Sequence, residues 1–70
     1  VTMSPLMLDV RRMRERRGMT QVQLAELAGV RQATISAMET GQTRGVDFDV
    51  LERIAEVLDV EPGSLIVRQA

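Results

Sequence analysis

Apolar residues recur at helical spacing along most of the chain. Leu6, Val10 and Met13 lie four and three positions apart, a period that places side chains on one face of a helix. Pro62 suits the first turn of a further short helix. No stretch alternates strictly between apolar and polar residues, as a half-buried strand does. The pattern therefore predicts an all-α chain with five helices, which cover residues 6–17, 21–28, 32–40, 48–58 and 62–67.

The segment from residue 20 to residue 41 carries the clearest helix boundaries. Thr20 is a favourable N-cap, and Gln23 three residues later completes a capping box. Gly29 and Gly41 follow the second and third predicted helices, where a positive φ ends a helix. Two short helices joined by a three-residue turn that begins with glycine are the layout of a helix-turn-helix. The second helix of such a unit enters the major groove of DNA.

The outward face of the third predicted helix could contact base edges. Ile35 and Met38 are expected to face the core, which leaves Gln32, Ala33, Ser36 and Ala37 outward. Gln32 has the donor and the acceptor that adenine requires, the alanines can meet a thymine methyl, and Ser36 suits a base or a phosphate. Arg31, just before the helix, could reach phosphate or guanine. A plain solvated helix with alanine chosen for helix propensity explains the same face.

Composition limits the remaining chemistry. The chain has no cysteine and no histidine, which excludes disulfides and thiolate or imidazole metal sites and leaves serine without its usual base. We therefore expect no enzyme activity, no cofactor and no small-molecule ligand. Phe48 is the one aromatic residue, which argues against stacking of single-stranded bases.

Length and hydropathy indicate one small domain. Seventy residues suffice for a single domain, which we expect over residues 6–67 between tails at 1–5 and 68–70. No apolar run is long enough to span a membrane and no signal peptide is visible. We therefore expect a cytoplasmic, nucleoid-associated protein.

Charge is distributed unevenly. Residues 1–44 hold seven arginines and four acids (7 − 4 = +3), whereas residues 45–70 hold two arginines and six acids (2 − 6 = −4). A basic half of this kind can face a polyanion. Ordinary surface solubility explains the distribution equally well.

Together these segments resemble the phage-repressor/Cro-type helix-turn-helix domains, also called the XRE family. The resemblance covers residues 10–66 and is carried by VRRMRERRGMTQ (10–21), LAELAGV (24–30), TIS (34–36), ETG (39–41), FDVLERIAEVL (48–58) and VEPGSL (60–65). It implies a compact five-helix, lambda-repressor-like fold with the helix-turn-helix in helices 2 and 3. It also implies a transcriptional regulator, a repressor that binds a short palindromic operator in double-stranded DNA as a homodimer.

The resemblance also implies residue roles. Base contacts fall to Gln32, Ala33, Ser36 and Ala37. Phosphate contacts fall to Gln21, Gln42, Thr43 and Arg44, to which we add Arg31 for its position. Arg14 and Glu39 match a structural ion pair. Many family members have polar side chains at the positions of the two alanines, and a small N-cap where Arg31 stands, so we expect modest specificity that relies partly on DNA shape.

Two surfaces are candidates for dimerisation. One contains Leu65, Ile66 and Val67, and the other contains Met3, Leu6, Met7 and Leu8; both sets could equally well close the small core. Other biological roles for the same fold are an antitoxin or a controller of a restriction–modification system. A protein-interaction module without DNA binding is the alternative of a different class.

Overall fold

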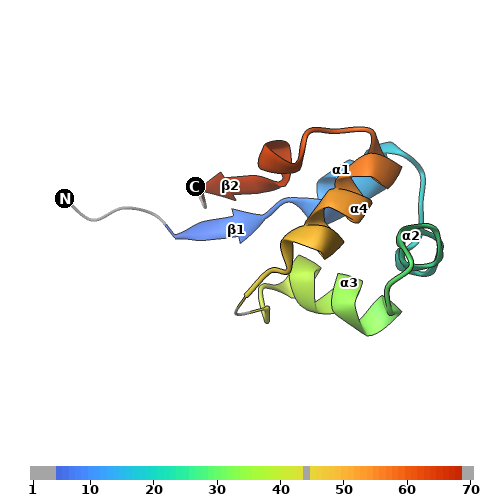
Figure 1. Cartoon of the computed structure of the whole chain (residues 1–70), viewed down its shortest axis with the longest axis horizontal. Coiled ribbons are helices and arrows are strands. Elements are labelled where there is room, and N and C mark those ends of the chain that lie inside the picture. Colours follow the sequence, from blue (N-terminus) through green and yellow to red (C-terminus); the bar gives the residue numbers. More distant parts are fainter. Residues whose placement is uncertain (1–4, 44, 69–70) are drawn as a thin grey trace.

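The computed structural model describes residues 5–43 and 45–68. Met3 and Arg44 therefore lie outside the described residues, as do residues 1–4, 69 and 70 of the expected tails. The described elements, in chain order, are β1 (Leu6–Leu8), α1 (Val10–Arg16), α2 (Gln21–Ala28), α3 (Gln32–Thr40), α4 (Phe48–Leu58), the 3₁₀ helix η1 (Pro62–Leu65) and β2 (Ile66–Arg68) (Figure 1). In this part of the chain, no helix is long and apolar enough to cross a membrane.

The expectation of five helices in an all-α fold is wrong in one respect: the described chain has four α-helices and a small two-stranded antiparallel sheet of β1 and β2. The segment predicted as a fifth helix is a single 3₁₀ turn followed by a strand. Gly63 and Ser64 are weak helix formers, and the β-branched Ile66 and Val67 favour a strand. A 3₁₀ turn of four residues is therefore as much helix as this segment forms.

The first helix begins at Val10 rather than at Leu6, because the preceding residues pair with the end of the chain. β1 and β2 are antiparallel, with Leu6 opposite Arg68 and Leu8 opposite Ile66. The backbone N–H of Asp9 donates to the carbonyl of Leu65 over 2.8 Å. A partner some sixty residues away leaves no local signal, so the apolar spacing alone indicated a longer helix.

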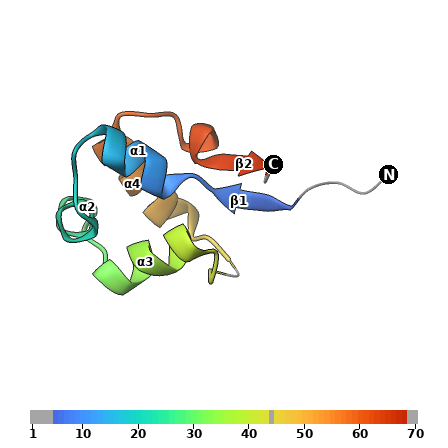
Figure 2. The same cartoon turned by 180° about the vertical axis from the view of Figure 1, so that it is seen from behind.

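One apolar core joins the four helices and η1. Its largest fully buried side chains are Val10, Leu24, Ile35, Ile54, Leu58 and Leu65. Each side chain of this size contributes about 1.5–3 kcal/mol when fully buried. α4 supplies four of the core residues. The β1–β2 sheet projects from the helical body at the end away from α2, as both views show (Figures 1 and 2).

The predicted boundaries of α2 are confirmed. The Gln23 N–H donates to Thr20 Oγ1 over 3.1 Å, and the Thr20 N–H donates to Gln23 Oε1 over 2.8 Å, which completes the capping box. Gly29 and Gly41 end α2 and α3 with φ values of 71° and 75°. These left-handed conformations are accessible to glycine at little cost.

Candidate nucleic-acid interface

A close crossing of α2 and α3 sets the geometry of the candidate interface. α2 packs against α3, and the small side chains of Ala25 and Ala28 are buried beneath α2. The Val30 N–H donates to the Ala25 carbonyl over 3.0 Å and fixes the turn. Ile35 and Met38 of α3 are buried, as predicted. α3 consequently lies along one edge of the molecule with its opposite side uncovered (Figure 2).

The four expected base-contacting residues lie on that uncovered side to different degrees. Gln32 and Ala33, in the first turn of α3, are exposed. Ser36 and Ala37, in its second turn, are half-buried. The N-terminal half of α3 is thus the part that is most open to a groove of DNA.

Glu39, near the end of α3, is the centre of a polar network. Its side chain is fully buried, and Arg14 of α1 binds it through both carboxylate oxygens, with Nε 2.6 Å from Oε2 and Nη2 2.9 Å from Oε1. Arg11 Nε donates to Oε1 over 3.3 Å and Gln21 Nε2 donates to it over 3.1 Å. Arg14 Nη1 also donates to the Met19 carbonyl over 2.7 Å. The network therefore ties α1, the start of α2 and α3 together.

The network keeps Glu39 ionised. Burial acts to raise the pKa of the Glu39 carboxyl, but the hydrogen bonds from Arg14, Gln21 and Arg11 outweigh it, so the pKa lies below its ordinary value. The hydrogen bond to Glu39 likewise raises the pKa of the Arg14 guanidinium, against the opposing effect of burial. Both groups carry their charges in the folded protein.

Gln21 links this network to Gln32, one of the expected base-contacting residues. It is the first residue of α2, as Gln32 is the first residue of α3. Because a carboxylate can only accept, the side-chain N–H₂ of Gln21 faces Glu39. Gln21 Oε1 is then free to accept a hydrogen bond. Gln32 Nε2 donates to that Oε1 over 3.5 Å, a long hydrogen bond. Gln32 then keeps its own carbonyl oxygen and one N–H for a ligand.

Sequence reasoning missed these connections. It assigned Gln21 a phosphate, gave Arg11 no role, and linked neither residue to Glu39. The contacts join residues 18 and 28 positions apart, so no helical period indicates them.

Three of the residues expected to bind phosphate lie at the ends of α3. Gln42 is exposed and Thr43 is half-buried directly after the helix, and Arg44 lies outside the described residues. Arg31 is exposed at the N-cap of α3 and makes no side-chain capping bond. Most other described arginines bind acids of the same chain, as Arg12 binds Asp9 over 2.6 Å. Arg31 has no such partner among the described residues.

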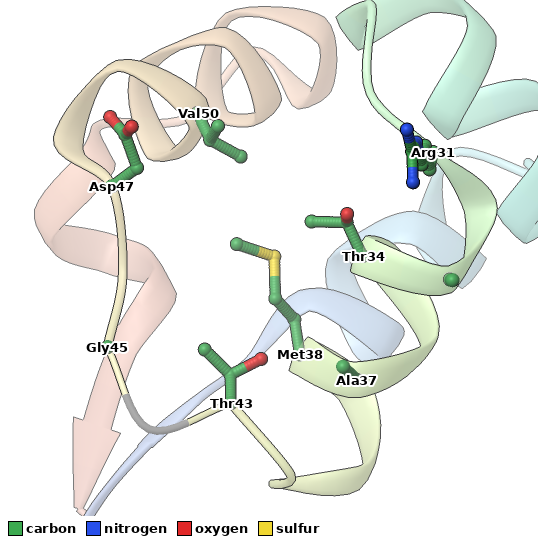
Figure 3. Close-up of a pocket in the computed structure, with 9 residues that line it drawn as sticks. Arg31, Thr34, Ala37, Met38, Thr43, Gly45, Asp47 and Val50 are labelled. Carbon is green, nitrogen blue, oxygen red and sulfur yellow. The ribbon is translucent and has the colours of Figure 1, made fainter.

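A shallow cavity of about 400 Å³ opens between α3 and the start of α4. Figure 3 shows the Met38 side chain pointing into it, with Arg31 and Asp47 on opposite sides. Small-molecule sites place convergent polar groups around an apolar pocket. Arg31 and Asp47 do not converge, so this cavity lacks the features of such a site.

Comparisons with known proteins agree with this geometry. The Helix-turn-helix family model matches residues 10–65. The crystal structure of SinR, a master regulator for biofilm formation, in complex with DNA is 30% identical, with a TM-score of 0.77 over 80% of this chain and 89% of that chain. The N-terminal DNA-binding domain of SinR from Bacillus subtilis is also 30% identical, with a TM-score of 0.76 over 80% of this chain and 81% of that one.

A complex of SinR with the SinI protein matches at 30% identity and a TM-score of 0.77, over 80% of this chain and 54% of that chain. The present chain thus spans about half the length of that relative. No curated protein sequence matches the chain significantly. The family match covers the whole helical body, from the start of α1 to the end of η1. The chain therefore belongs to the XRE-type helix-turn-helix family.

Proposed function

We propose that this protein regulates transcription by binding a short palindromic operator in double-stranded DNA as a dimer, and that it acts as a repressor. The observation that carries the proposal is the placement of Gln32 at the exposed start of α3, held by Gln21 with an acceptor and an N–H available. That pair of groups matches the major-groove edge of adenine. The DNA complex of the SinR relative supports the same assignment.

The roles of the interface residues follow from their positions. Gln32 and Ala33 contact bases first, and Ser36 and Ala37 extend the reading face along α3. Gln21 binds a phosphate through its backbone N–H and the side-chain N–H that Glu39 leaves free, at the N-terminus of α2, where the helix dipole favours an anion. Arg31, Gln42 and Thr43 add phosphate contacts at the ends of α3, and Arg44, which lies outside the described residues, joins them on the resemblance alone. The protein acts on the nucleoid in the cytoplasm.

Selection of preferred duplexes from a random pool tests this proposal. Gln32→Ala should relax the preference at one base pair, with about 1–3 kcal/mol of lost discrimination. Gln21→Ala should weaken binding to every selected duplex. Glu56→Ala, an exposed change on α4, is the control and should leave both unchanged. The assignment is wrong if neither glutamine variant alters DNA affinity.

A protein-interaction module is the competing function. Val22 and Leu27 of α2 are 45% and 64% exposed, and the SinR relative binds a protein, SinI. Salt dependence separates the two functions, because phosphate contacts release counterions and make affinity fall steeply as salt rises. DNA affinity that is weak and insensitive to salt would favour the module.

A further inference from the structure

Among the described residues, no strand pairs with the outer edge of β1, and β1 itself carries no charge. The Asp9 N–H donates to the Leu65 carbonyl one register position beyond the Leu8–Ile66 pair, and the positions whose backbone groups face the partner strand alternate along an antiparallel ladder. Met7 therefore directs its backbone groups to Val67, whereas Leu6 and Leu8 direct theirs away from β2. Proteins usually protect an open edge with a charge, a proline or a bulge. The three residues of β1 carry no charge, and Leu6 is 63% exposed.

A groove of about 350 Å³ runs beside β1. It is lined by Pro5, the β1 residues and the segment from Met38 to Gly41 at the end of α3. The one charged side chain in this lining, Glu39, is neutralised by Arg14 over 2.6 Å. The groove lining therefore offers no uncompensated carboxylate and no cationic side chain of its own, which suits an apolar strand better than a phosphate or a charged peptide.

We propose that two copies of this chain pair their β1 strands antiparallel about Met7, so that their two β1–β2 sheets form one four-stranded sheet. Leu6 then lies opposite Leu8 of the second copy, in two hydrogen-bonded pairs related by the two-fold axis. Pro5 falls opposite Asp9 at a position that requires no N–H. The carboxylate of Asp9 is already bound by Arg12, so no like charges face each other. This inference rests on the proposed function, because a palindromic operator requires a two-fold dimer.

The surface is small, and its location suits DNA binding. Paired three-residue strands bury far less than the roughly 1,000 Å² expected of a stable interface, so the dimer forms on the operator and not in dilute solution. The β1–β2 sheet projects away from α2 (Figures 1 and 2). The pairing therefore leaves Gln32 and Gln21 uncovered. This pairing involves both candidate dimerisation surfaces of the sequence analysis, since Leu6, Leu8 and Ile66 belong to the same β1–β2 sheet.

A charge-swap experiment tests the axis at Met7, which is 43% exposed. Met7→Lys and Met7→Glu each place like charges opposite one another across the axis, whereas a mixture of the two variants places opposite charges there. On a selected palindromic duplex, each variant alone should lose cooperative binding and the equimolar mixture should regain it. Affinity for a duplex with one half-site scrambled should stay within about twofold of the parent. Leu27→Lys is the matched control. Cooperativity retained by both single variants, or not regained by the mixture of folded variants, overturns the proposal.

Crosslinking gives a second readout. Residues directly opposite in a non-hydrogen-bonded pair have Cα atoms about 4.5 Å apart, within disulfide reach. The chain has no cysteine, so oxidised Met7→Cys should form a covalent dimer on the palindromic duplex and Leu27→Cys should not. Equal crosslinking of both variants overturns the pairing. If selection yields single half-sites bound without cooperativity, the dimer is wrong and DNA binding stands. If selection yields no duplex, the proposed function fails, and crosslinking of the concentrated free protein decides the β1 pairing.

Discussion

Gln21 and Gln32 are the first residues of α2 and α3, and their side-chain amides meet at 3.5 Å. Gln21 is itself oriented by the buried carboxylate of Glu39, 3.1 Å away. Gln32, which we propose reads a base, is therefore positioned by two side chains, those of Gln21 and Glu39, that lead into the protein interior. Its orientation depends on packing as well as on DNA.

The two glutamines should be energetically coupled in DNA binding. Gln21→Ala frees Gln32 to rotate, so it should lower base discrimination at the position that Gln32 reads as well as overall affinity. A double-mutant cycle on the selected duplex should give a coupling of about 0.5–3 kcal/mol. A sum of single effects equal to the double effect would mean that the long hydrogen bond has no role in reading.

Removal of the Glu39 carboxylate should strongly destabilise the fold. Glu39→Ala leaves Arg14, with 11% of its side chain exposed, without its counter-charge, and breaking such a buried pair costs about 3–5 kcal/mol. Arg11→Ala removes a partner whose side chain is 58% exposed and should cost less than about 1 kcal/mol. Urea unfolding measures both. Equal effects of the two variants would contradict the central role of the Arg14 contact.

The same carboxylate should make stability fall in acid. The pKa of Glu39 is lower in the folded chain than its ordinary value of 4.5, so the unfolded chain takes up this proton first as pH decreases. The contribution of Glu39 is therefore complete above pH 4.5 and is lost as pH falls through the lower folded pKa. The free energy of unfolding, measured from pH 7 downward, should decline less steeply in Glu39→Gln. Parallel curves for the two proteins would contradict this prediction.

η1 should contribute to stability through one side chain. Leu65 is fully buried, whereas Leu27 of α2 is 64% exposed. Leu65→Ala should lower the free energy of unfolding by about 2–5 kcal/mol, and Leu27→Ala should lower it by less than about 0.5 kcal/mol. Thermal and urea unfolding of the pair provide the comparison. A small effect of Leu65→Ala would mean that η1 is peripheral to the core.

The sequence predicted those parts of the fold that depend on neighbouring residues. Thr20 and Gln23 indicated the start of α2 because a capping box spans four residues, and Gly29 indicated its end because a left-handed residue favours glycine. β1 was not predictable in this way. Its partner, β2, lies at the other end of the chain, and an apolar run as short as Leu6 to Leu8 fits a helix or a strand until that partner is known.

The candidate interface was predictable to a similar extent. The inward positions of Ile35 and Met38 follow from helical spacing, and they define the outward face by exclusion. The links from Glu39 to Gln21 and Arg11 depend on how three helices pack, and a single sequence does not contain that information in its periodicity. Resemblance to a family suggested the Arg14 and Glu39 pair, and it left the further members of the network unassigned.

The β1–β2 sheet also offers a route to joining the two ends of the described chain. Because Leu6 and Arg68 are cross-strand neighbours, the two ends of the described chain leave the molecule side by side. A short peptide could join them into a backbone-cyclised protein without passing near Gln32. Cyclisation would reduce the entropy of the unfolded chain and raise the melting temperature while α3 stays unchanged.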